Sequence, residues 1–146
     1  MNHNNLNKID DRTFQNLTEI TFLNLSYCQI EQLHRDSFVG LHKLESLDLR
    51  HNQIILPEGL RPGLFPQQTS LKVLKMLGQL QYDGEAANLT YPDQVLSDLK
   101  MLTFLSLDGL SLLHVINLGL GFRNLNFLES LVFGGRYCLM GEPYYL

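Results

Sequence analysis

The amino-acid sequence predicts an α/β solenoid, in which short repeats stack as successive coils and each coil contributes one short parallel strand. Two observations carry this prediction. Leu is heavily over-used, and the pattern LxxLxLxxN/CxL recurs, most clearly from Ile20 to Leu33 and again from Leu44 to Ile54. The equivalent residues Leu23 and Leu47 are 24 residues apart (47 minus 23), which is a repeat length typical of such coils.

The xLxLx segment of each copy predicts a strand whose leucines point inward and whose intervening residues point outward onto a concave face. Looser copies place Leu74, Leu105 and Leu131 at the equivalent position, with spacings of 27, 31 and 26 residues (47 to 74, 74 to 105, 105 to 131). We therefore expect the equivalent leucines, from Leu23 onward, to lie side by side in adjacent parallel strands.

The rest of each copy should form a convex side that is irregular or carries short helical turns. Phe14 and Phe38 begin FxxL segments that fill the space behind the sheet. Asn52 falls where the turn leaves backbone groups in need of partners, and a buried amide supplies both donor and acceptor. Cys28 occupies the same slot, where we interpret it as a small buried thiol; the role of Cys138 stays open.

One repeat domain is expected over residues 1–146, with about five to six repeats. The first copy lacks its strand and the last ends without a closing group of cysteines, so we expect both ends to be uncapped, as in a fragment. Irregular insertions are expected near 57–68, which is rich in Pro and Gly, and near 78–94, which is polar.

Composition excludes several functions. A net charge of -4 and the lack of any Lys/Arg run argue against a nucleic-acid patch. The most apolar stretch, 105–122, is interrupted by Asp108 and His114, so no membrane span is expected. The polar N-terminus lacks the apolar core of a signal peptide, and the chain expressed as given is expected to stay in the cytosol.

Nothing in the sequence predicts catalysis. The histidines are scattered over different repeats and form neither HExxH nor a Cys/His cluster with metal spacing. The segment 119–124 has Asn where a dinucleotide-binding loop requires its last Gly. We expect no catalytic residue, no metal site and no cofactor, and hence a protein that is not an enzyme.

The outward strand positions are the candidate site for a ligand or partner, because aromatic and charged groups side by side on a rigid sheet are typical of recognition surfaces. Its predicted members are Phe22, Asn24, Ser46, Asp48, Arg50, Lys75, Phe104, Ser106 and Asp108. The alternative is an ordinary solvated face with internal ion pairs.

The strands LNLSYCQI and LDLRHNQI, with Phe14 and Phe38 as FxxL partners, resemble the typical leucine-rich repeats of Toll-like receptor ectodomains. The later runs YPDQVLSDLKMLTFLSLDGL and FRNLNFLESL resemble them too, so that the resemblance covers most of the chain. It implies a horseshoe that binds a protein or microbial ligand, often as a receptor dimer, and that passes a signal to an intracellular domain. That domain, a membrane span and cysteine-rich caps are not in this sequence.

Three Asn-x-Ser/Thr sequons point independently to the extracellular side of a membrane receptor as the location of the parent protein. They begin at Asn16, Asn24 and Asn88, and such sites are glycosylated only on the secretory route. Asn24 lies between Leu23 and Leu25, so a glycan there would block the concave face.

Two other functions remain open. A generic extracellular leucine-rich-repeat module for protein interaction or adhesion would share these repeats but would lack a membrane span and signalling domain further along its chain. An enzyme such as a ligase, which uses repeats only to choose its substrate, would carry a catalytic domain beyond either end.

Overall fold

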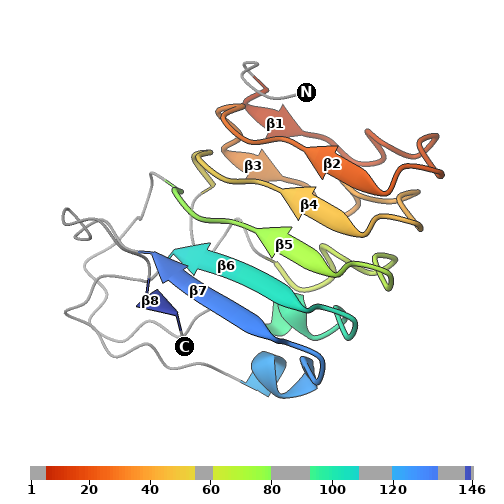
Figure 1. Cartoon of the computed structure of the whole chain (residues 1–146). Helices are drawn as coiled ribbons and strands as arrows, with labels where there is room; N and C mark the ends of the chain where they lie inside the picture. Colours follow the sequence, from red (N-terminus) through yellow and green to blue (C-terminus); the bar gives the residue numbers. More distant parts are fainter. Residues whose placement is uncertain (1–5, 55–60, 80–92, 109–119, 135–143, 146) are drawn as a thin grey trace.

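The computed structural model describes residues 6–54, 61–79, 93–108, 120–134 and 144–145. Its elements are the strands β1 (Lys8–Ile9), β2 (Phe22–Asn24), β3 (Gln32–Leu33), β4 (Ser46–Asp48), β5 (Val73–Lys75), β6 (Phe104–Asp108), β7 (Ser130–Gly134) and β8 (Tyr144–Tyr145), and the 3-10 helices η1 (Asp93–Leu96) and η2 (Leu120–Asn124). Figure 1 shows them as successive coils, with the strands of neighbouring coils side by side.

The main sheet has the order β2-β4-β5-β6-β7-β8, and its first five strands are parallel. The Cα register pairs Leu23 with Leu47, Leu47 with Leu74, Leu74 with Leu105, and Leu105 with Leu131. The predicted solenoid is confirmed, because the equivalent leucines lie in adjacent parallel strands.

A second, two-stranded parallel sheet joins β1 to β3 and lies behind the main sheet in Figure 1. Its Ile9 and Leu33 are neighbours in the register and are both buried in the core. The first two coils thus carry a short strand behind the main sheet, β1 and β3, where the sequence led us to expect irregular backbone or helical turns. The expected short helical turns appear instead in later coils, as η1 and η2.

Three phenylalanines stack behind the main sheet, one from each of three coils. The ring centroids of Phe14 and Phe38 are 6.1 Å apart, and those of Phe38 and Phe65 are 5.5 Å apart. Phe65 falls in the expected insertion near 57–68, yet Leu64, Phe65 and Gln68 are all buried. Residues 61–68 therefore belong to the regular coil, since Phe65 follows Phe38 by the same 27 residues that separate β5 from β4.

The expected polar insertion near 78–94 also begins inside the coil. Gln79 is buried at 9% exposure and hydrogen-bonds to the backbone of Leu49 and Ile54. Its amide is stable there because both its oxygen and its nitrogen find partners. Residues 80–92 of this insertion lie outside the described part of the chain.

One short strand follows the last parallel strand in the sheet. Strand β8 pairs antiparallel with β7, so that Tyr145 lies opposite Val132 and Tyr144 lies opposite Phe133, and this part of the edge of β7 is paired. A paired edge does not offer free backbone groups for association with another sheet. In the described residues, no helix has the length and apolar character that crossing a membrane requires.

Candidate binding surface on the concave sheet

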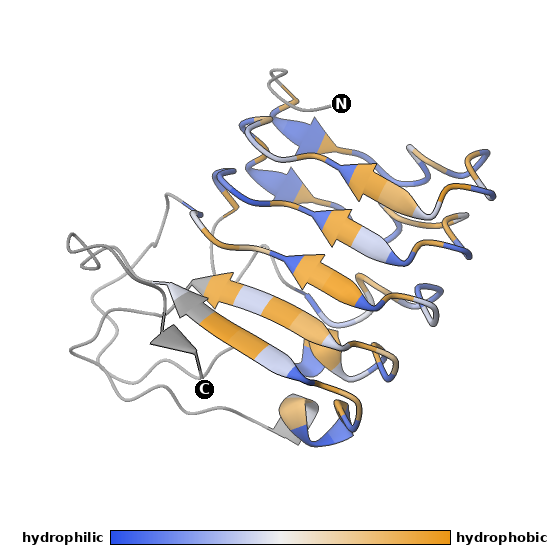
Figure 2. Ribbon diagram, viewed as in Figure 1, coloured by the Kyte–Doolittle hydropathy of each residue, from blue (hydrophilic) through white to orange (hydrophobic). Residues whose placement is uncertain are grey.

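The register brings the predicted site residues together in rows that run across the strands. The first row contains Phe22, Ser46, Val73, Phe104 and Ser130, and the second contains Asn24, Asp48, Lys75, Ser106 and Val132. Arg50 follows the second row by two residues on the same face. Asp108 ends β6 opposite Gly134, and its side chain lies outside the described part of the structure. In Figure 2, the strands β2, β4 and β5 each end on a hydrophilic residue, which is the member of the second row that the strand contributes.

Position on the concave face does not guarantee exposure. Phe22 is 58% exposed, whereas Asp48 is 3% and Ser106 is 2% exposed. Neighbouring strands are only about 4.8 Å apart, so that long side chains crowd short ones between them. Phe22 and the half-buried Lys75 therefore supply more contact area than Asp48 or Ser106, whose polar atoms act mainly on their neighbours.

Strands β2 and β4 end in the same local hydrogen-bonded turn. The Asn24 Oδ1 accepts from the backbone nitrogen of Ser26 at 2.9 Å and from its hydroxyl at 2.7 Å. One coil later, the Asp48 Oδ1 accepts from the backbone nitrogen of Arg50 at 3.1 Å. Asn and Asp favour this arrangement because their short side chains reach the amide two residues on.

Asp48 and Arg50 also form a two-pronged ion pair. The Arg50 Nε donates to both carboxylate oxygens, at 2.9 and 3.1 Å, and Nη2 donates to Oδ2 at 2.7 Å. Desolvation by burial on its own would raise the pKa of Asp48. The hydrogen bonds from Arg50 and the charges of Arg50 and Lys75 outweigh that effect and hold the pKa below 3.8. The same pair raises the pKa of Arg50.

Two exposed rings stand just beyond the ends of β2 and β4. Tyr27 and His51 stack with ring centroids 4.4 Å apart, and both have a positive φ, 55° and 54°. The equivalent position of the next coil is Gly78, at φ 81°, where a Cβ would overlap the His51 ring. The sequence reasoning missed this pair; the signal was that Tyr27 and His51 each precede the Cys28 or Asn52 slot by one residue.

The glycosylation candidates occupy different surroundings. Asn16 is exposed in the turn before β2, whereas Asn24 is half-buried with its amide oxygen already bonded to Ser26. Asn88 lies outside the described residues.

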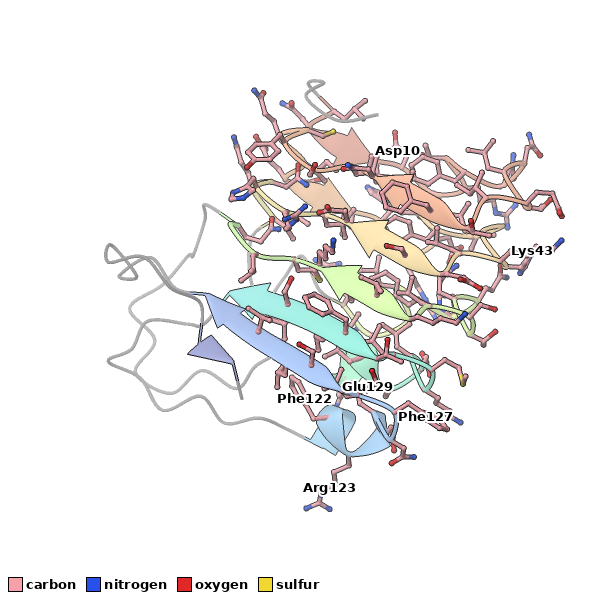
Figure 3. All side chains as sticks on the ribbon, in the orientation of Figure 1. Asp10, Lys43, Phe122, Arg123, Phe127 and Glu129 are labelled. Atoms are coloured by element: carbon pink, nitrogen blue, oxygen red, sulfur yellow. The ribbon has the colours of Figure 1, made fainter. Side chains whose placement is uncertain are left out.

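Other exposed groups lie away from the concave rows. Lys43 is paired with Glu19 on the side where the strands begin, and Phe127, 58% exposed, lies beside the last coil (Figure 3). Asp10 and Asp11 flank His34 at 3.8 Å near β1. Among the residues that the structure describes, no three His, Cys, Asp or Glu side chains are grouped so that they could hold a metal ion. Cys28 is a buried thiol that donates to the Ser26 carbonyl.

Comparison with known proteins agrees with this geometry. Residues 1–54 match a family model described as "Leucine rich repeat", and residues 43–66 match a second model described as "Leucine Rich Repeat". Residues 1–66 thus match leucine-rich repeats. The parallel register continues the same repeats beyond the matched residues to β7.

The leucine-rich-repeat chain is also similar to the CD180 antigen of Mus musculus. The two are 42% identical over 52 residues, which are 36% of this chain and 8% of that protein. The chain thus corresponds to a small part of the relative's length. Together with the family matches, this similarity supports repeats of the kind found in Toll-like-receptor ectodomains.

Proposed function

We propose that this leucine-rich-repeat chain recognises a ligand or protein partner on its concave sheet, as part of the extracellular side of a Toll-like-receptor-type innate immune receptor. The observation that carries the proposal is the pair of outward rows on β2 to β7, in which aromatic, charged and amide groups lie side by side on rigid strands. Rows of this kind offer a partner several contacts, and their side chains lose little conformational entropy on binding because the strands are rigid.

The similarity to CD180 antigen, a leucine-rich-repeat protein related to the Toll-like receptors, favours an immune receptor over other uses of such repeats. Signal transduction, a membrane anchor, a receptor dimer and glycosylation belong to this proposal for the parent protein. The alternative is a generic extracellular interaction or adhesion module. It binds through the same face, and a membrane span and signalling domain in the parent transcript would argue against it.

A direct test compares the two faces of the solenoid with one substitution on each. Ser46→Arg places a long cation in the first concave row, and Gln32→Arg places the same side chain on the exposed position of β3 behind the sheet. The purified chain is immobilised and screened by biolayer interferometry against purified bacterial cell-wall products and secreted host proteins. We expect a ligand to lose binding to the Ser46 variant and to retain binding to the Gln32 variant. Equal binding to both variants, or loss only with Gln32→Arg, would contradict the proposal.

The extracellular location has its own test. Mass spectrometry of the natural protein should find a glycan on Asn16, whose turn is exposed. Unmodified asparagine at all three sequons of a protein purified from its source would argue against the secretory route.

A further inference from the structure

We infer that the group recognised at the centre of the concave sheet is a carboxylate on an acidic segment of a protein partner, received beside Arg50 and Lys75. This inference rests on the proposed function, because it names the chemistry of the ligand at that same face. Four observations on the described residues lead to it: the geometry of Arg50, the charge balance of the second row, the hydroxyl of Ser106 and the ring of Tyr27.

Arg50 is held in place with part of its guanidinium still available. Asp48, whose side chain is only 4% exposed, binds Nε and Nη2, whereas no hydrogen bond of Nη1 is found within the described residues. The Arg50 side chain is 41% exposed. A planar guanidinium that is already oriented binds a carboxylate with little further loss of side-chain freedom.

The charge balance of the row favours an anion with one negative charge. Lys75 is the register partner of Asp48, and its charge lowers the pKa of that carboxyl. Lys75 forms no ion pair within the described part of the chain. Among the described side chains of this face, Arg50 and Lys75 therefore face the one carboxylate of Asp48. This leaves about one positive charge, equal in size to the charge of a carboxylate and smaller than that of a phosphate monoester. Asp108 ends β6, and its side chain lies outside the described part of the structure.

Ser106 supplies a donor that lacks an acceptor. It is the register partner of Lys75, it is 2% exposed, and its hydroxyl has no hydrogen-bond partner among the described residues. A buried hydroxyl without a partner destabilises the fold, and none of the described second-row side chains accepts from it. A carboxylate oxygen that enters between Lys75 and β6 can accept this O–H.

The rings next to the cations favour a peptide over a free ion. Tyr27 is 48% exposed and stacks on His51, and its backbone nitrogen donates to the carbonyl oxygen of Arg50 at 3.0 Å. Tyr and Arg side by side are typical of the residues that carry most of the binding energy at protein interfaces. The surface thus fits an acidic segment that also carries an aromatic or apolar side chain.

The chain contains no Trp, so a Trp-containing peptide can be followed by its own fluorescence. The probe is the acetylated and amidated peptide Gly-Asp-Trp-Glu-Gly, titrated with the whole chain, and its matched controls are Gly-Asn-Trp-Gln-Gly and Gly-Lys-Trp-Lys-Gly. We expect the acidic peptide to bind, the two controls to bind at least about tenfold more weakly, and added salt to weaken the acidic peptide alone.

Substitutions locate the interaction. Lys75→Gln should weaken binding of the acidic peptide about tenfold, and Ser106→Ala should weaken it by a smaller factor. Lys43→Gln removes the same charge on the lateral side, where Lys43 is paired with Glu19, and should leave binding unchanged. Asp108→Asn removes one negative charge at the end of β6 and should not weaken binding. Thermal unfolding of Lys75→Gln should change little, because the Lys75 side chain forms no ion pair within the described residues and acts on Asp48 only through its charge.

The inference is overturned if the neutral peptide binds as well as the acidic one, if no acidic peptide binds, if Lys75→Gln and Lys43→Gln behave alike, or if Asp108→Asn weakens binding. These failures are distinct from failure of the proposed function. A ligand from the face-comparison screen that is lost with Ser46→Arg would keep the concave face as the binding surface, and only its acidic chemistry would be wrong.

Discussion

Asn52 and Gln79, from neighbouring coils, donate to the same backbone acceptor: each amide nitrogen lies 2.8 Å from the carbonyl oxygen of Leu49. The oxygen of Asn52 accepts from the backbone nitrogens of Cys28 and Ile30, and that of Gln79 accepts from the nitrogen of Ile54. Gln79 also donates to the carbonyl oxygen of Met76 at 3.2 Å, so these two side chains satisfy buried backbone groups in three successive coils. They connect the coils just beyond the strands that carry the candidate site.

Replacement of Asn52 should be among the most destabilising single changes in the chain. In Asn52→Ala, the nitrogens of Cys28 and Ile30 lose their acceptor, and buried groups left without partners cost about 1–3 kcal/mol each. We expect a loss of about 3 kcal/mol or more in the free energy of unfolding, measured by urea denaturation. Gln53→Ala, at the half-buried neighbouring position, is the control and should change stability by less than about 1 kcal/mol. Similar losses for both variants would contradict the assigned role of Asn52.

Substitutions at Gly40 and Gly63 distinguish two sources of destabilisation, a steric overlap with a neighbouring backbone and an unfavourable φ angle. Both have a positive φ, 97° and 83°, which costs an L-residue about 1–2 kcal/mol. A Cβ at Gly40 would also overlap the carbonyl of Gln15, whereas at Gly63 the nearest atom is the Arg35 Nε at 3.1 Å, on a flexible side chain. Gly40→Ala should therefore lower the melting temperature clearly more than Gly63→Ala. Equal shifts in the melting temperature of the two variants would contradict a steric overlap between the coils at Gly40.

The phenylalanine stack should account for a large share of the stability of the first three coils. Phe38 is fully buried between Phe14 and Phe65, and Phe38→Ala should cost about 3–5 kcal/mol in urea denaturation. Phe22→Ala removes the same ring from an exposed position on the concave face and should cost less than about 1 kcal/mol. A large loss from Phe22→Ala would show that this ring packs within the fold and is not available to a partner.

Asp48 should make the free energy of unfolding depend on pH. The pKa of its carboxyl is lower in the folded chain than the ordinary 3.8, so the folded state binds a proton less readily than the unfolded state. The charged carboxylate therefore stabilises the fold fully above the unfolded pKa, and this contribution is lost as the pH falls through the lower folded pKa. Asp48→Asn should be less stable at neutral pH and should lose less stability on acidification, as followed by urea midpoints across the acid range. Parallel curves for the two proteins would contradict this account.

Much of the candidate site follows from sequence spacing, because one inward Leu fixes the register of a whole strand. Once Leu47 and Leu74 are equivalent, Asp48 must lie beside Lys75, and Phe22 must lie in a row with Ser46. Gln79 was also within reach of this reasoning: it follows Met76 by three residues, as Asn52 follows Leu49. Its polar neighbours favoured an insertion, and that interpretation was wrong for Gln79 itself.

The sequence alone determined the coil and the order of its strands, since periodic leucines must share one hydrophobic core and their alternation decides which side chains face outward. Only the tertiary structure decided how neighbouring coils complete one another: Asp48 is buried beneath Arg50, the ring of Tyr27 rests on His51 above Gly78, and β8 covers the edge of β7. Each of these contacts depends on the exact height and tilt of one coil against the next, and residue spacing carries no information about either.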